Sequence, residues 1–277
     1  MNQMLATTTS APTSAPTSRS VGDLLRIWRQ RRRLSQLDLA LDADISQRHL
    51  SFVESGRATP SREMVLRLAA QLDVPLRERN ALLLAAGYAP TYRERSLDDP
   101  DLLPARRAID LLLKAQEPYP ALAVDRRWTM VAANAVVPLL LAGVADASLL
   151  QPPVNVLRLS LHPGGLAPAI VNLPEWRAHV LERLERQIDV AADPVLAELR
   201  VELAAYPVAA STAQAPLDPA GLVVPLVLRT PAGTLSFLST TTVFGTPVDV
   251  TLSELAIESF FPTDAETAEA LRRLSAP

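Results

Sequence analysis

The feature that most constrains the fold is a run of short amphipathic segments over residues 21–87, separated by residue types that begin and end helices. Ser35 and Ser46 each precede a segment whose apolar residues recur at helical spacing, and serine is a preferred N-cap. Gly56 follows one segment and Pro60 precedes the next, as expected at helix ends and starts. The pattern predicts an all-α region of five short helices.

The spacing of the second and third helices is the most informative part of this run. The expected helices cover residues 21–33, 36–41 and 47–55, then one that opens at residues 60–61 and one over residues 75–87. In the second helix, Leu37, Ala40 and Leu41 are expected to face the core. Only a few residues join the second helix to the third, which is the spacing of a helix-turn-helix. In that unit the second helix of the pair enters the DNA major groove.

The expected third helix has polar side chains on the side opposite its apolar residues, Leu50 and Val53. The polar side chains are Gln47, Arg48 and Ser51, and the aromatic ring of Phe52 lies on the same side. Glutamine and arginine form bidentate hydrogen bonds with adenine and guanine edges, and a phenylalanine ring suits a thymine methyl group. The face is therefore suited to base contacts, although a single charged residue on a helix is more often simply solvated.

Charge divides the chain into two parts. Residues 19–95 hold 14 Arg against 9 Asp and Glu, a net charge of +5, whereas residues 96–277 hold 13 basic against 21 acidic residues, a net charge of −8. A basic N-terminal third beside an acidic remainder indicates two domains, the first of them suited to a polyanion.

Residues 34–61, LSQLDLALDADISQRHLSFVESGRATPS, resemble the DNA-binding domain of the phage-repressor-like (Cro/C1, or XRE) family. The resemblance implies that Gln36 and Arg57 contact phosphates and that the polar residues of the third helix face bases. It also implies an internal pair between Arg29 and Glu54. The partner implied is a double-stranded DNA operator, bound by a homodimer because one recognition helix covers few base pairs.

The rest of the chain changes to a mixed pattern of strands and helices. A first helix is expected over residues 104–115, a hairpin of strands over 121–124 and 128–134, a helix over 135–141, two long helices opened by Pro174 and Pro194, three strands over 222–230, 233–245 and 247–262, and a last helix over 264–274. Asn134 is expected to cap the helix after the hairpin, and Thr263 and Glu266 to form a capping box. This order suits one antiparallel sheet with helices on one face, a PAS-like α+β domain that encloses a pocket.

These patterns give a multidomain fold class, an all-α five-helix helix-turn-helix domain followed by an α+β PAS-like domain. The expected boundaries are a disordered tail over residues 1–18, the DNA-binding domain over 19–88, a linker over 89–104 and the PAS-like domain over 105–277. Residues 1–18 lack a basic and an apolar region of a signal peptide, and no apolar run is long enough to span a membrane. The expected location is the cytoplasm.

Signals of catalysis are missing from the sequence. It contains no phosphate-binding loop, no G-x-S-x-G and no H-E-x-x-H, and it has no cysteine. The histidines are scattered, so His162 and His179 are expected to be solvated or singly hydrogen-bonded rather than metal ligands. We therefore expect no enzyme activity, no metal and no cofactor.

The second part also resembles a known domain, the MmyB-like ligand-binding domain. The segments that carry the resemblance are EPYPALAVDRRWTMVAAN at 117–134, NVLRLSLHP at 155–163, NLPEWR at 172–177 and FGTPVDVTLSELAIESFFPTDAETAEALRRL at 244–274. The resemblance implies a PAS-like fold and a small-molecule effector, with a fatty acid or another apolar molecule as candidates. The candidate ligand-binding residues are Arg158, Asn155, Trp128, Met130, Trp176 and Phe237.

Each of these candidates has a purely structural alternative. Arg158 is a charge between two leucines, so it needs a partner, either a carboxylate of the protein or the head group of an anionic ligand. Asn155 suits a cap or a turn as well as a ligand contact. The aromatic residues and Met130, together with Phe260, suit either a cavity wall or a plain core.

The combined expectation is a sequence-specific DNA-binding transcriptional regulator whose C-terminal domain senses a small apolar or fatty-acid-like effector. The alternative is a regulator of the same DNA-binding type whose C-terminal domain is a dimerisation or protein-partner module without a ligand.

Overall fold

The computed structural model describes residues 19–207 and 223–275. The chain divides into two compact units, Met1–Thr91 and Tyr92–Pro277. The expected tail over residues 1–18 lies outside the described residues. None of the helices in the described part of the chain is long and apolar enough to cross a membrane.

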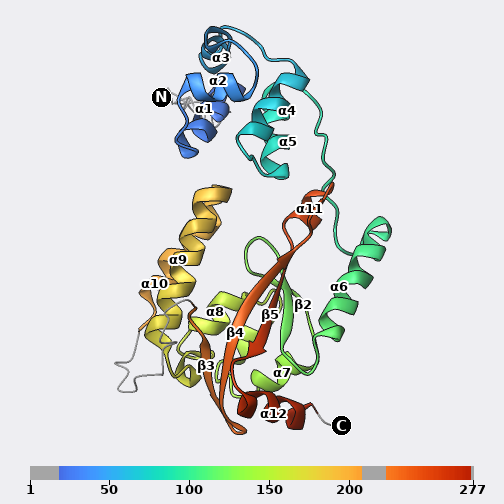
Figure 1. Cartoon of the computed structure of the whole chain (residues 1–277), viewed down its shortest axis with the longest axis vertical. Helices are drawn as coiled ribbons and strands as arrows, with labels where there is room; N and C mark the ends of the chain where they lie inside the picture. Colours follow the sequence, from blue (N-terminus) through green and yellow to red (C-terminus); the bar gives the residue numbers. More distant parts are fainter. Residues whose placement is uncertain (1–18, 208–222, 276–277) are drawn as a thin grey trace, which may run out of the picture. The chain divides into compact units, whose positions relative to one another are not determined.

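The first unit is all-α, as predicted, and consists of five helices in its described residues (Figure 1). They are α1 (Val21–Arg31), α2 (Gln36–Asp42), α3 (Gln47–Glu54), α4 (Arg62–Gln71) and α5 (Leu76–Ala85). Serine side chains cap the first four, and at α2 the cap is a reciprocal capping box between Ser35 and Asp38. Leu25, Leu50 and Leu68 are fully buried and contribute to the core of the unit.

The inward face of α2 differs from the prediction. Leu39, Ala40 and Ala43 are buried, whereas Leu37 is 50% exposed and Leu41 is 70% exposed. Both triplets fit a helical stripe, because a helix of only seven residues does not distinguish two apolar faces. The packing of α2 against α3 and α4 selects the face that is buried, and the periodicity of the sequence does not show this packing.

Gly22 allows α1 to approach the end of α3 very closely. A Cβ atom at this position would lie 2.3 Å from the backbone oxygen of Val53 and 2.9 Å from that of Glu54. Such distances are far inside van der Waals contact, so only glycine fits without moving the backbone. This close packing brings the start of α1 against the helix that presents the polar face.

The second unit contains a five-stranded antiparallel sheet in the order β2-β1-β5-β4-β3 (Figure 1). The strands are β1 (Ala121–Val124), β2 (Met130–Ala133), β3 (Leu226–Thr230), β4 (Gly233–Val243) and β5 (Ala256–Pro262). The helices are α6 (Leu103–Ala115), α7 (Val136–Leu140), α8 (Val156–Leu161), α9 (Leu173–Ala191), α10 (Pro194–Ala205), α11 (Val250–Ser253) and α12 (Ala265–Leu274), with short 3₁₀ turns at Pro100–Leu102, Ala147–Leu150 and Ala167–Ala169. The predicted antiparallel α+β domain is confirmed.

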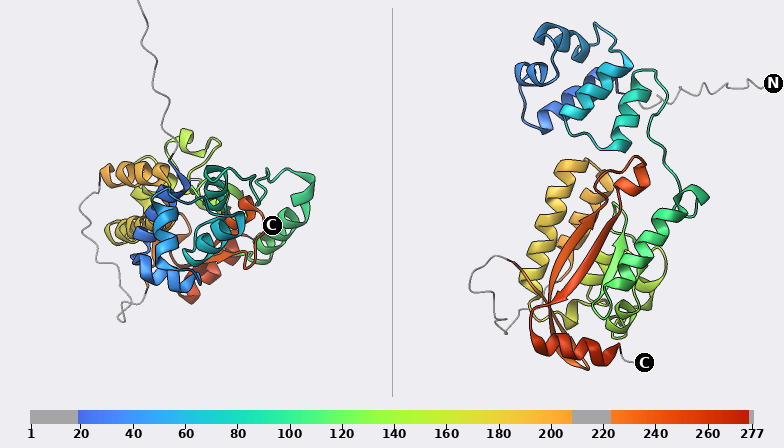
Figure 2. Two further views of the ribbon diagram at one scale, coloured as in Figure 1. Left: turned by 90° about the horizontal axis from the view of Figure 1, so that it is seen from above. Right: turned by 45° about the vertical axis from the view of Figure 1, so that its right-hand side comes forward.

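Helices cover both faces of the sheet, so the expectation of helices on one face is wrong (Figure 2). Ala121 and Ala123 of β1 pack with Ile109 of α6, whereas Leu122 and Val124 belong to the larger core on the other face. All four residues of β1 are buried, and an unbroken apolar run is typical of a strand covered on both sides. In the sequence, the signal for this burial is the apolar run ALAV, which lacks the alternating polar residues of a half-exposed strand.

Three local expectations are corrected. The segment expected to be a strand over residues 247–262 forms helix α11 first, capped by Asp249, and only its second half is strand β5. Asn134 does not cap α7: its amide donates to the carbonyls of Leu113 and Tyr119 at 3.3 and 2.8 Å, and its oxygen accepts from a β1 backbone N–H. The cap of α12 is Asp264 rather than a box begun by the preceding threonine.

The segment that follows the first unit packs onto the second. Arg93 forms a parallel bridge with Asp249, and its carbonyl accepts a hydrogen bond from the backbone of Val250 at 2.8 Å. The Thr251 hydroxyl donates to the carbonyl of Arg95 at 2.6 Å. Residues expected to belong to a linker are therefore hydrogen-bonded to the turn that contains α11.

Candidate nucleic-acid interface and ligand cavity

Helix α3 combines a buried face with an exposed polar one. The side chain of Ser46 caps the helix by accepting a hydrogen bond from a backbone N–H of its first turn at 3.2 Å. Leu50 and Val53 are fully buried, while Gln47 and Arg48 are exposed. The first turn of α3 therefore presents an amide and a guanidinium to solvent at the end of the helix that enters a groove in this motif.

Ser51 and Phe52 extend this face along the helix, and both are half-buried. The guanidinium of Arg48 lies 5.3 Å from the centre of the Phe52 ring, one helical turn away. Such a cation–π contact holds the long arginine side chain along the helix and reduces the entropy it loses on binding. The residues predicted to contact bases thus share one side of α3.

Arg29, Glu54 and Gln36 form a polar cluster beneath this face. The guanidinium of Arg29 donates from Nε and Nη2 to the two carboxylate oxygens of Glu54 at 2.7 and 2.8 Å, which is the pair implied by the resemblance. The Glu54 side chain is 2% exposed, and its carboxylate raises the pKa of Arg29. Gln36 donates from Nε2 to Glu54 at 2.9 Å, which leaves the second N–H of this amide for another acceptor.

Arg57 lies exposed in the turn after α3. Gly56 has a positive φ of 72°, the left-handed conformation that glycine adopts without strain, and it turns the chain away from the helix. The backbone N–H of Arg57 donates to the carbonyl of Phe52 at 2.8 Å, so the turn is fixed while the guanidinium extends into solvent. Gln36 is the first residue of α2, so both residues expected to contact phosphates lie at helix ends.

The second unit contains a cavity of about 120 Å³ between the sheet and helices α7, α8 and α9. Its wall is mostly apolar and includes Leu122, Val137, Leu140, Leu157, Leu159, Val180, Leu226, Leu228 and Phe260. The expected aromatic residues and Met130 line it as well: Trp128, Met130, Trp176 and Phe237 all contribute to the wall. A mostly apolar space of this size suits a small apolar molecule.

Arg158 and Asn155, two of the candidate ligand contacts, lie outside the lining of this cavity, and each has a structural role of the kind named as its alternative. Arg158 points outward from α8 and forms three hydrogen bonds of 2.8 to 3.1 Å with Glu202 on α10. This pairing lowers the pKa of Glu202, and burial together with Glu202 raises the pKa of Tyr206 to about 12. Asn155 caps α8, and its amide donates to the carbonyl of Arg127 at 2.8 Å. On this helix of six residues, the apolar neighbours of Arg158 in the sequence do not imply that Arg158 itself is buried.

Trp128 enters the cavity wall from a strained turn. Its φ is 65°, a left-handed conformation that costs a bulky residue about 1–2 kcal/mol. The carboxylate of Asp125 accepts the backbone N–H groups of Arg127 and Thr129, both at 2.8 Å, and so holds the turn. The indole N–H of Trp128 donates to Gln187 at 2.8 Å. The conformation directs the ring towards α9 instead of along the strand.

The polar part of the cavity wall was missed from the sequence. It consists of Ser160, His179, Arg183 and Glu258. Glu258, the charged residue of strand β5, is 4% exposed, and a charge in a mostly apolar run was the signal that the sequence offered. His179 was expected to be solvated or singly hydrogen-bonded; its ring stacks on Trp176 with centroids 5.6 Å apart, and burial lowers its pKa. By contrast, His162 accepts one hydrogen bond, from the backbone of Gly164 at 3.0 Å.

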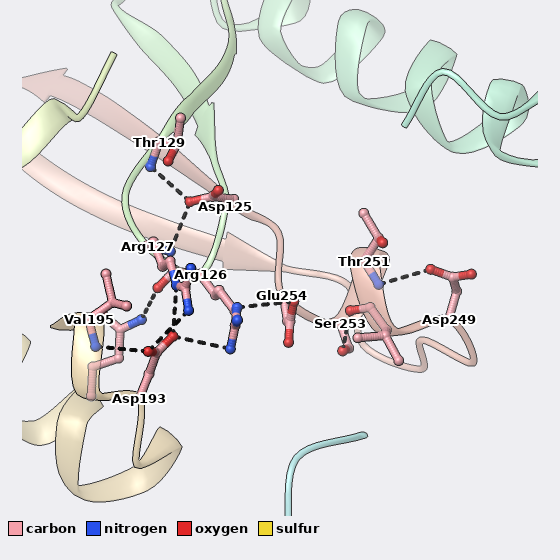
Figure 3. A network of polar contacts seen from close by, with 12 residues as sticks. Asp125, Arg126, Arg127, Thr129, Asp193, Val195, Asp249, Thr251, Ser253 and Glu254 are labelled. Atoms are coloured by element: carbon pink, nitrogen blue, oxygen red, sulfur yellow. Dashed lines mark hydrogen bonds and ion pairs between the residues drawn. The ribbon is translucent and has the colours of Figure 1, made fainter. Parts of the chain in front are cut away.

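Two carboxylates, of Asp193 and Glu254, and two arginines connect the ends of several elements near α11 (Figure 3). Asp193, between α9 and α10, accepts from Arg127 at 2.9 Å and pairs with Arg126 at 3.1 Å. Burial raises the pKa of Asp193, but these arginines more than offset it, so the pKa lies below its usual value. Arg126 also approaches Glu254, which joins α11 to β5, at 3.7 Å. The network ties the β1–β2 turn to the helical hairpin and to α11.

The described residues contain no cluster of three or more histidine and carboxylate side chains that could hold a metal ion.

The fold and the two sites define a class of protein. A helix-turn-helix unit joined to an α+β unit with an apolar cavity is the architecture of a ligand-responsive transcription regulator.

Comparisons with protein families identify both units. Residues 105–274 match the MmyB-like transcription regulator ligand binding domain, and residues 25–79 match a helix-turn-helix family. Since the first match covers more than half of the chain, the protein belongs to the MmyB-like family of transcription regulators. It is a DNA-binding transcription regulator with a ligand-binding domain. A comparison with curated proteins gave no match.

Proposed function

We propose that the protein binds a specific DNA operator through α3 and that a small apolar or fatty-acid-like effector in the cavity controls this binding. The observation that carries the first part is the polar face of α3, next to the hydrogen-bonded cluster of Arg29 and Gln36 around the buried Glu54. Solvent-facing amide and guanidinium groups at the start of such a helix match the donor and acceptor pattern of base edges.

The roles proposed for individual residues follow their positions. Gln47, Arg48 and Ser51 contact base edges, and Phe52 contacts a thymine methyl group. Gln36 and Arg57 contact phosphates, which positions the helix without specifying a sequence. Replacing Arg57 with alanine is expected to reduce the slope of log K against log salt by about one, because each phosphate contact releases about one counterion. An unchanged slope would remove Arg57 from the phosphate contacts.

The effector part of the proposal rests on the cavity. Its lining is predominantly apolar, and its position between an antiparallel sheet and a layer of helices is that expected of a PAS-like sensor domain. The strand order β2-β1-β5-β4-β3 supports the same description of the fold. The apolar lining favours a molecule that is mostly hydrocarbon.

A route for coupling the cavity to the DNA-binding unit runs through β5. This strand contributes Glu258 and Phe260 to the cavity and follows α11 directly. The α11 turn holds residues 93–95, close to the start of the second unit at Tyr92, through the hydrogen bonds of Val250 and Thr251. An effector that binds one position of β5 better than another would thereby change how this segment is held.

The same proposal includes a homodimer in the cytoplasm, without enzyme activity. A dimer places two recognition helices about 34 Å apart on one side of the duplex, which supplies the affinity that one helix lacks. Sedimentation of the full chain with and without operator DNA measures the stoichiometry directly.

One observation favours a second candidate function for the C-terminal unit, namely a dimerisation or partner-binding module without a ligand. Leu111 and Leu112 on α6 are 69% and 50% exposed, and Leu103 on the same helix is 43% exposed. An apolar surface of this kind is more often found at interfaces than on monomers.

Native mass spectrometry of the full chain purified from its own cells separates the two candidates. A stoichiometric small molecule that is released on mild denaturation, and that is lost when the bulkier side chain of Val180→Trp fills the cavity, is the expected result. The second candidate is favoured instead if the chain carries no ligand and its oligomer dissociates on Leu111→Glu.

A further inference from the structure

The polar groups of the cavity wall are not equivalent in what they offer a ligand. Arg183 and Glu258 are already paired: the guanidinium donates to both carboxylate oxygens, at 2.5 and 3.0 Å. The Thr241 hydroxyl donates to Glu258 at 2.9 Å and accepts from Arg183 at 2.7 Å. The guanidinium also lies 4.5 Å from the centre of the Trp128 ring. Among the described residues that line the cavity, Arg183 is the one arginine or lysine, and a buried carboxylate of the protein itself neutralises it.

An anionic ligand is disfavoured by this arrangement. To reach Arg183, its carboxylate has to displace Glu258 or share the guanidinium with it. In the first case Glu258, which is 4% exposed, loses its partner, and an unpaired buried charge is costly. In the second case two carboxylates lie side by side next to an apolar wall, where like charges repel strongly.

The other two polar groups suit an uncharged ligand. Burial, and secondly the charge of Arg183, lower the pKa of His179, so its ring is neutral at physiological pH and has one N–H donor and one acceptor nitrogen. Arg186 lowers this pKa as well, while Glu182 and Glu258 act in the opposite direction. The Ser160 oxygen accepts from the indole N–H of Trp176 at 3.0 Å, and its own O–H still has to find an acceptor.

We infer that the cavity selects an uncharged effector: a compact, mostly hydrocarbon molecule with one hydroxyl, carbonyl or ester group that bonds to His179 and Ser160. The inference rests on the proposed function and narrows it, from apolar or fatty-acid-like molecules to uncharged ones. The cavity of about 120 Å³ is comparable to apolar cavities of about 150 Å³ that bind a benzene-sized molecule. The effector is accordingly of this size class.

The test compares two probes of nearly equal shape, hexan-1-ol and hexanoate, by calorimetric titration of the full chain at about pH 7.5, where the carboxylate is ionised. Hexan-1-ol is expected to bind at least about tenfold more tightly, because only hexanoate brings a charge to a site that is already neutral. Equal or tighter binding of hexanoate overturns the inference and leaves an effector cavity in place. If neither probe binds, the effector part of the proposed function fails as well.

A charge-removing variant makes the reason testable. Glu258→Gln keeps the shape and a hydrogen bond to Thr241 but frees the charge of Arg183. Hexanoate is expected to gain about tenfold in affinity on this change, with hexan-1-ol altered by about twofold or less. The matched control is Glu202→Gln, which frees Arg158 outside the cavity and is expected to change neither affinity. If hexanoate gains nothing in a Glu258→Gln protein that still binds hexan-1-ol, the inference is wrong; the comparison on the unaltered chain stands even if the variant does not fold.

Discussion

Each unit of the chain contains one arginine bound by a buried glutamate, and the two pairs differ in their surroundings. Arg29 and Glu54 lie within the packed core of the DNA-binding unit, with side chains 11% and 2% exposed. Arg183 and Glu258, 28% and 5% exposed, lie at the edge of a cavity. The first pair joins the end of α1 to the end of α3, so it fixes two helices relative to each other. The second pair borders space that a ligand can enter. The same chemistry thus supports rigidity in one unit and selectivity in the other.

The largest expected effect comes from breaking the enclosed pair. Glu54→Ala leaves Arg29 buried without its carboxylate and is expected to cost about 4 kcal/mol of opening free energy in the first unit. Native-state hydrogen exchange of the α1 and α3 amides measures this value within the full chain. Glu182→Ala, which removes one half of an exposed ion pair on α9, serves as the control and is expected to change stability by about 0.5 kcal/mol or less. Equal costs for the two variants would mean that Glu54 is not a structural centre of the unit.

A smaller effect is expected at the polar face itself. Arg48→Ala removes one bidentate base contact and is expected to weaken operator binding by about 2 kcal/mol, with much less effect on random DNA. Fluorescence anisotropy with both duplexes at one salt concentration gives the two losses. Arg272→Ala on α12 of the other unit removes the same charge and is the control. If Arg48→Ala weakens both duplexes equally, this arginine is a phosphate contact rather than a base contact.

The attachment of residues 93–95 to the α11 turn, within the second unit, is expected to contribute about as much as one hydrogen bond. Thr251→Val removes the donor to the carbonyl of Arg95 and keeps the shape of the side chain. It is expected to reduce the coupling between effector and DNA by about 1 kcal/mol, while the affinity of the cavity for its ligand is unchanged. The measurement is the operator affinity of the unaltered protein and of the Thr251→Val variant, each with and without ligand in the cavity. Coupling that stays the same in the variant would exclude this hydrogen bond from the route.

The smallest effect is expected at the Arg158–Glu202 pair, which is exposed. Arg158→Ala is expected to cost less than about 1 kcal/mol, and to leave ligand affinity within about twofold. Because Arg158 lowers the pKa of Glu202, the stabilisation is present above the ordinary pKa of glutamate and is lost as the pH falls through the lowered value. Thermal unfolding of both chains should therefore converge in acid. A ligand affinity that falls more than tenfold would return Arg158 to the cavity.

The sequence predicted the folds of both units well but predicted only half of the cavity. Caps, glycines and apolar spacing are local, so the helices of the first unit and the strand pattern of the second followed from them. The face of α2 did not, because two leucine sets share the same period and tertiary packing chooses between them. The argument that a charge in an apolar run needs a partner was confirmed for Arg158, whose partner is Glu202 of the protein itself. The same argument applies to Glu258 but was not made for it, because the burial of its strand depends on residues distant in the sequence.

The most direct test of the account is the reciprocal effect of ligand and DNA. An operator duplex is first selected from a random library with the full chain, and its Kd is then measured for protein carrying its co-purified ligand and for the same protein after the ligand is removed. The account predicts that the two Kd values differ by about five- to 150-fold, as expected for coupled sites. Equal Kd values, or a library in which no sequence is enriched, would contradict it.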